Sequence, residues 1–132
     1  MLKLKKILKN ILIFIIYSNT YLSIGASIVA LVSAKLLGLP VNWLILFIPF
    51  SASMLIYNLN RYTDVIEDSI NVPQRVYFIY KYGKLFIFSG IIMYIISLIY
   101  SFIINFTMFI FTLLPVVIAF IYSVLRLKRY LS

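Results

Sequence analysis

The chain contains 132 residues, of which 64% are hydrophobic and 11% charged, and its mean hydropathy is +1.11; this excludes a soluble globular domain and predicts a membrane protein. Twelve lysines and arginines against three acidic residues give a formal charge of +9, but most of these cations flank apolar runs, so we interpret them as topology signals and headgroup contacts, with no nucleic-acid partner. The sequence has no cysteine or histidine, which excludes disulfides, thiol and imidazole chemistry and Cys/His zinc sites.

The first predicted element follows a basic start. Residues 1–9 contain four lysines among apolar residues and resemble an amphipathic segment that lies on an anionic membrane surface. Residues 10–34 carry no charge, which predicts a first membrane span at about 11–36. The alternative is a cleaved signal peptide, but the uncharged run is too long for one.

The second predicted span covers about 41–58. Gly38 and Pro40 mark the turn before it, and Pro49 is expected to kink it. Residues 58–68 contain no glycine or proline, so we expect this helix to continue beyond the span, into the membrane interface. A hydrophilic segment follows at 59–84.

The later part of the chain predicts two further spans. Pro73 is expected to open a short helix, and Tyr82 to Lys84 to mark a boundary. The uncharged run 85–125 is 41 residues long and would extend about 62 Å as one helix, twice the thickness of a bilayer core. We therefore predict spans at 85–101 and 107–125, with Asn105 as the best turn residue and a kink at Pro115.

The charges predict the orientation. With four spans, the N-terminus, the 59–84 loop and the C-terminus share one side and hold every cation except Lys35. The excess of lysine and arginine on that side places both termini and the loop in the cytoplasm of a cell-membrane protein. The sequence thus predicts an all-α polytopic bundle of four transmembrane helices, forming a single domain over 1–132.

The only three acidic residues of the chain, Asp64, Glu67 and Asp68, lie within this loop. On a helix, Asn60, Asp64 and Asp68 share one face because four residues advance about 400°. One amide and two carboxylates are suitable ligands for Mg²⁺ that keeps several waters and is completed by substrate phosphates. The competing interpretation is a solvated helix end that contains a few acids.

Cationic and small residues supply two further predictions. Arg75, Arg61 and Lys81 are candidate pyrophosphate-binding residues, and Arg75 is the best placed because it follows the Pro73 turn. Lys84 is a weaker candidate. Small residues are expected at helix–helix contacts; they include Ser23, Gly25, Ala26, Ser51, Ala52, Ser53 and Gly90.

The motif Asn60-x-x-x-Asp64-x-x-x-Asp68, and the segment from Asp68 to Arg75 that follows it, resemble the first aspartate-rich motif of the UbiA-type intramembrane prenyltransferases. The resemblance implies a helical bundle around a lipid-facing cavity, with Mg²⁺ holding a prenyl pyrophosphate. Departure of pyrophosphate leaves an allylic carbocation that alkylates an aromatic or lipid acceptor. By position, Asn60, Asp64 and Asp68 would hold the metal and Arg75 the pyrophosphate.

Members of that family normally have more spans and a second aspartate-rich motif, whereas this chain has no acid after Asp68. We therefore expect a truncated or half form, completed by a second-half polypeptide or by another copy of itself. The alternative is a non-catalytic four-span protein whose cytoplasmic helix end binds a cation or a partner. A small multidrug exporter ranks last, because none of the predicted spans contains an acid.

Overall fold

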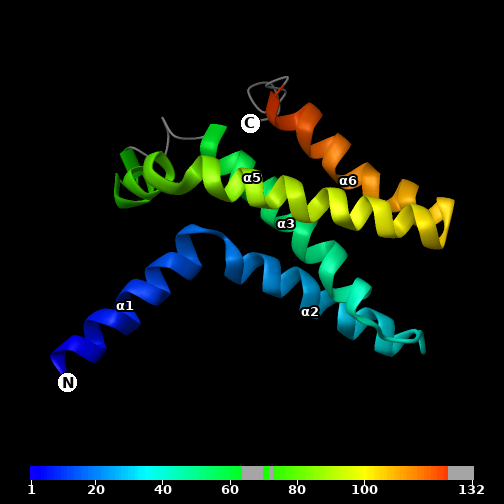
Figure 1. The fold of residues 1–132 in the computed structure, drawn as a ribbon, viewed down its shortest axis with the longest axis horizontal. Helices are drawn as coiled ribbons and strands as arrows, with labels where there is room; N and C mark the ends of the chain where they lie inside the picture. Colours follow the sequence, from blue (N-terminus) through cyan, green and yellow to red (C-terminus); the bar gives the residue numbers. More distant parts are fainter. Residues whose placement is uncertain (64–69, 72, 125–132) are drawn as a thin grey trace.

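The computed structural model describes residues 1–63, 70–71 and 73–124. Within these ranges the regular structure is entirely α-helical, which confirms the all-α part of the predicted fold class (Figure 1). The helices are α1 (Leu2–Tyr17), α2 (Thr20–Leu36), α3 (Trp43–Thr63), α5 (Pro73–Ile104) and α6 (Phe106–Val124).

Two of the described helices, α3 and α5, are long and apolar enough to cross a membrane, and α1 and α2 together make a third candidate if the bent pair is one span. A shorter apolar helix lies at Phe106–Tyr122, within α6. The described part of the chain therefore provides two to three helices of spanning length, whereas the sequence predicts four spans.

The first predicted span is not one continuous helix. It breaks after Tyr17, and the axes of α1 and α2 meet at an angle of 65°. The cause is local: Ser18, Asn19 and Thr20 are three consecutive polar residues, and Asn19 adopts the left-handed conformation with φ of 61°. Among residues other than glycine, asparagine is one of those that enter this region most readily.

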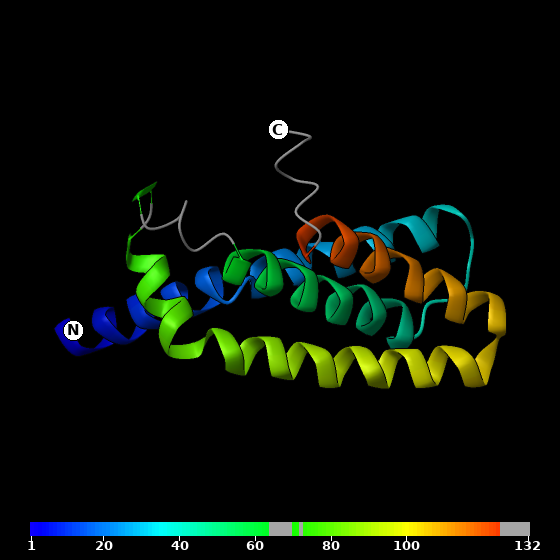
Figure 2. The same cartoon turned by 90° about the horizontal axis from the view of Figure 1, so that it is seen from above.

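Helix α5 begins at Pro73 and ends at Ile104, one residue before Asn105, which confirms the predicted helix start and the predicted turn. The helix that Pro73 opens is not short, because it contains 32 residues. The boundary predicted at Tyr82 to Lys84 is wrong, because the helix runs through it. Figure 2 shows instead that the first part of α5 is set at an angle to the remainder. Gly83 is packed within the helix: a Cβ there would lie 3.1 Å from Ile79 and 3.4 Å from Tyr62.

Successive long helices run in opposite directions, and α3 is central, with contacts to α2, α5 and α6 (Figures 1 and 2). Ser27 Oγ of α2 donates to the Leu46 carbonyl of α3 at 2.6 Å, and the two helices meet again at their other ends through Asn19 and Asn58. The ends of α1 and α3 and the start of α5 therefore lie at one end of the bundle.

Small hydroxyl residues join α3, α5 and α6. The hydroxyls of Ser51 and Ser97 lie 2.7 Å apart, those of Ser101 and Thr112 lie 3.1 Å apart, and Tyr94 donates to the Thr112 carbonyl at 2.8 Å. All five side chains are buried. Interhelical hydrogen bonds between small residues suit helices in lipid, because apolar burial alone does not bring such helices together.

Candidate functional site

Three helix ends meet at the end of the bundle that precedes the acidic motif. They are the α1–α2 junction, the last two turns of α3 and the first turns of α5. The side chain of Asn58 connects the first two: its Nδ2 donates to the Ser18 carbonyl at 3.0 Å and to the Met54 carbonyl at 2.8 Å, and its Oδ1 accepts from Asn19 Nδ2 at 3.3 Å. Ser18, Asn19 and Asn58 are buried.

This polar junction is required by the break in the helix. A carbonyl at the end of α1 has lost its partner within the helix, and an unpaired carbonyl away from water is costly. Asn58 supplies the missing donor to Ser18. The sequence pattern alone did not indicate Asn19 or Asn58. The available signal was the run of three polar residues at 18–20, inside an apolar segment that is predicted to be one span.

An aromatic cluster connects the end of α1 to the start of α5. Phe14 meets Phe78 and Phe86 edge to face, with ring centroids 6.1 and 5.3 Å apart, and Phe78 stacks on Phe86 at 5.6 Å. Tyr17 packs against Phe78 at 5.7 Å. Phe78 and Phe86 are in the buried core together with Met54 of α3. The cluster therefore fixes the first turns of α5 against both α1 and α3.

Arg75 lies in the first turn of α5, against Tyr17. Its guanidinium carbon is 6.0 Å from the Tyr17 ring centroid, and the Tyr17 hydroxyl donates to Gln74 Oε1 at 3.4 Å. The cation–π distance is at the outer limit for such contacts. The Arg75 side chain is half-buried, so it is positioned at the junction and is not extended into bulk solvent.

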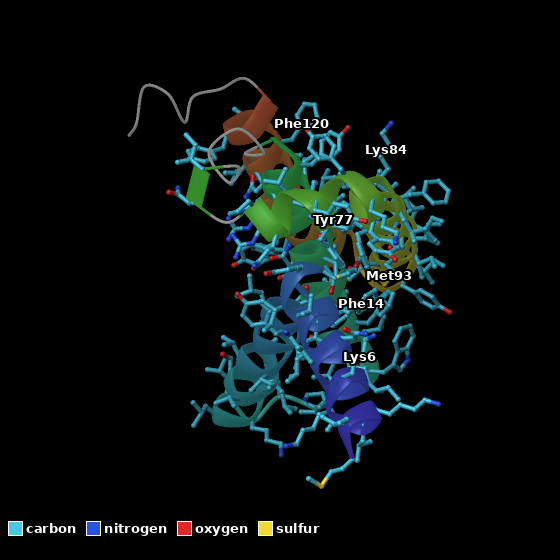
Figure 3. The ribbon with its side chains drawn as sticks, turned by 90° about the vertical axis from the view of Figure 1, so that its left-hand side faces the viewer. Lys6, Phe14, Tyr77, Lys84, Met93 and Phe120 are labelled. Carbon is cyan, nitrogen blue, oxygen red and sulfur yellow. The ribbon has the colours of Figure 1, made fainter. Side chains whose placement is uncertain are left out.

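The remaining predicted cations are placed less favourably. Arg61 is half-buried in the last turn of α3. Lys81 is exposed, with its Nζ 5.2 Å from the Tyr82 ring centroid. Lys84 is exposed and points away from the ribbon in Figure 3. Lys84 lies nine positions after Arg75, which puts the two on opposite faces of α5.

Of the predicted metal ligands, Asn60 is half-buried in the last turn of α3. Asp64 and Asp68 lie outside the described residues, as does Glu67, so the set Asn60, Asp64 and Asp68 stays a prediction. Among residues 1–63, 70–71 and 73–124 there is no group of three His, Cys, Asp or Glu side chains that could hold a metal ion.

Two apolar grooves run along the described part of the bundle. One, of about 510 Å³, lies between α2 and α3 and is walled in part by Trp43 and Phe47. The other, of about 340 Å³, lies where α2, α3 and α6 meet, and it includes Pro49, Ala52 and Pro115. Neither groove is lined by a charged side chain.

Comparison of the chain with protein-family models, with curated proteins and with solved structures finds no match.

Proposed function

We propose that this protein binds a prenyl pyrophosphate together with Mg²⁺ at the cytoplasmic mouth of a four-span bundle, as the donor-binding part of a UbiA-like prenyltransferase. The observation that carries the proposal is the placement of Arg75. The antiparallel packing of α3 and α5 and the Tyr17 contact put this half-buried cation at the end of the bundle where α3 leads into the only acidic residues of the chain.

The donor set suits the proposed ligand. Asn60, Asp64 and Asp68 are hard oxygen donors of the kind that hold Mg²⁺ with waters and phosphate oxygens, and a bound Mg²⁺ would neutralise charge on the pyrophosphate. Arg75 offers a planar guanidinium that can pair with phosphate oxygens in bidentate fashion. Arg61 and Lys81 add positive charge at the same end, which favours the approach of an anionic headgroup.

The apolar grooves suit the rest of the donor. Ala52, which lines the smaller groove, lies eight residues before Asn60 on α3, about 12 Å along the helix. A prenyl chain whose pyrophosphate is held at the mouth would extend along the bundle in that direction. The proposed acceptor is an aromatic ring or a lipid, and the proposed source of the second aspartate-rich motif is a second polypeptide or another copy.

The test is binding of geranylgeranyl pyrophosphate to the purified full chain in nanodiscs, measured by titration calorimetry with Mg²⁺ and with EDTA. We expect binding in Mg²⁺ that is lost in EDTA and in the double variant Asp64→Asn, Asp68→Asn. Arg75→Gln should weaken binding about 10- to 100-fold, because charged hydrogen bonds contribute about 1.5–3 kcal/mol.

Lys35→Gln is the matched control, since it removes one cation at the opposite end of the bundle and should leave the affinity unchanged. Equal binding by the wild type and the double aspartate variant would overturn the proposed site. Binding without transfer of a prenyl group to added acceptors is the result expected of a donor-binding part that lacks the second aspartate-rich motif. Transfer by the purified chain would show that copies of this chain complete the site and that no second polypeptide is needed.

A further inference from the structure

The first three turns of α1 are a two-faced helix without a partner among the described residues. Each of residues 1–12 is exposed, and the ring contacts of α1 with the bundle come only from Phe14 and Tyr17. Figure 3 shows the same arrangement, with Phe14 close to α5 and Lys6 further out along the helix. We propose that α1 lies in the cytoplasmic membrane surface and binds anionic lipid headgroups.

From residue 3 to residue 12, the apolar and the polar side chains of α1 lie on separate faces. At about 100° per residue, one arc of about 100° is entirely apolar: Leu4, Ile7, Leu8 and Ile11. The arc on the other side, about 160° wide, holds the polar side chains Lys3, Lys5, Lys6, Lys9 and Asn10, and its one apolar member is Leu2, the first residue of α1. The four apolar side chains are between 47% and 59% exposed. An apolar stripe of this width opposite a lysine face is typical of helices that lie in the membrane interface.

The lengths of α1 and α2 and the angle between them also support the placement of α1 on the membrane surface. Residues Leu2 to Leu36 would extend about 52 Å as a straight helix, whereas the bilayer core is about 30 Å thick. Helix α2 alone, with 17 residues, covers about 25 Å and approaches a full span. The axes of α1 and α2 differ by 65°, so a tilt of α2 by about 25° in the plane of the bend, which is within the usual range, lays α1 flat on the membrane.

Charge identifies the partner. The described residues of α1 include four lysines and no acid, so a second copy would bring like charges together on the polar face. An anionic bilayer satisfies both faces at once, with acyl chains under the leucines and isoleucines and headgroups beside the lysines. This placement also moves the start of the first span from residue 11 to the start of α2.

The experiment uses the full chain, which contains no cysteine, so a single introduced cysteine can carry a fluorophore. Ile11→Cys places the label on the apolar face and Lys9→Cys on the lysine face. The chain is reconstituted in phosphatidylcholine vesicles with and without phosphatidylglycerol. We expect the Ile11 label to become several-fold less accessible to aqueous acrylamide, and quenched by doxyl-labelled lipid, when phosphatidylglycerol is present; the Lys9 label should stay accessible.

Replacing all four lysines with glutamine should remove this dependence on phosphatidylglycerol, since each lysine near an anionic surface strengthens binding about fivefold. Ile99→Cys, on an exposed apolar face of α5, is the control for insertion and should be protected in both lipids. Equal acrylamide access at Ile11 and Lys9 in anionic vesicles overturns the proposal. The proposal is also overturned if protection of the Ile11 label from acrylamide increases with the amount of protein per vesicle but does not depend on phosphatidylglycerol. That result would show that a second copy of the chain covers the apolar face.

Discussion

Asn58 joins the helices at the end of the bundle that contains the candidate site. One amide group pairs with the end of α1, with the start of α2 and with its own helix. It lies two residues before Asn60, the first predicted metal ligand. Because Asn58 Nδ2 is the side-chain donor to the Ser18 carbonyl at the break, the loss of Asn58 would leave a buried acceptor unpaired, and that is costly.

We therefore expect Asn58→Leu, which keeps the volume but removes the hydrogen bonds, to lower the free energy of unfolding by about 1–3 kcal/mol. The measurement is the shift in the unfolding midpoint of the purified chain in detergent. Asn10→Leu is the control, because Asn10 is exposed on α1 and surface changes of this kind stay within about 0.5 kcal/mol. Equal midpoints for the two variants would contradict a structural role for Asn58.

At the scale of the helices, close approach of α3 and α5 depends on Gly90. A Cβ at this position would lie 3.1 Å from the Leu55 Cα and 3.2 Å from the Leu55 nitrogen. Both are backbone atoms of a packed helix and cannot move aside as a side-chain tip would. Gly25, which the sequence also suggested as a contact, has no such neighbour: a Cβ there would meet nothing within 4 Å. That part of the small-residue prediction is wrong.

The two glycines make a matched pair for mutation. Gly90→Ala should destabilise the bundle by about 1–3 kcal/mol, as overpacking does. Gly25→Ala should be neutral or stabilising by up to about 1 kcal/mol, because alanine is the better helix former. The stability of both variants is measured as the shift of the unfolding midpoint in detergent relative to the wild type. A Gly90→Ala protein as stable as Gly25→Ala would show that α3 and α5 are not packed as closely as described.

The helices also show what sequence patterns can and cannot predict. The start at Pro73 and the turn at Asn105 were predictable, because proline fixes a helix start and a 41-residue uncharged run is too long for one span. The break at Ser18 and Asn19 was missed because hydropathy averages over a window and gives little weight to three polar residues. The boundary expected at Gly83 failed because packing against Tyr62 and Ile79 keeps a glycine within a helix.

The candidate site was predictable only in part. Spacing alone put Asn60 on one face with the two aspartates, but it could not foresee that Arg75 would be placed by Tyr17, a residue 58 positions earlier in the chain. Such a contact depends on the bend between α1 and α2. Lys84, which has the same charge and lies in the same helix, is directed away from this junction. Residue type suggested both cations, and the tertiary arrangement distinguishes them.

At the scale of the whole molecule, successive helices run in opposite directions, and this places most of the described cations at one end of the bundle. Eight described cations lie on α1, the last turn of α3 and the first part of α5, all toward one end, while Lys35 lies at the end of α2 on the other side. An up-and-down bundle with this distribution would have its N-terminus and the site end in the cytoplasm. The same orientation is required if the proposed site is to meet a cytoplasmic prenyl pyrophosphate.

Single cysteines in the otherwise cysteine-free chain test this orientation in intact cells. Leu39→Cys and Asn105→Cys, in the two turns at the far end of the bundle, should react with a membrane-impermeant maleimide added from outside. Ile70→Cys, which is 81% exposed and lies between α3 and α5, should react only after the cells are made permeable. If Asn105 instead reacts together with Ile70 only after permeabilisation, then α5 does not cross the membrane and the four-span arrangement is wrong. If Ile70→Cys reacts from outside while Leu39→Cys and Asn105→Cys react only after permeabilisation, the bundle is inverted, and the end that contains the candidate site faces outward.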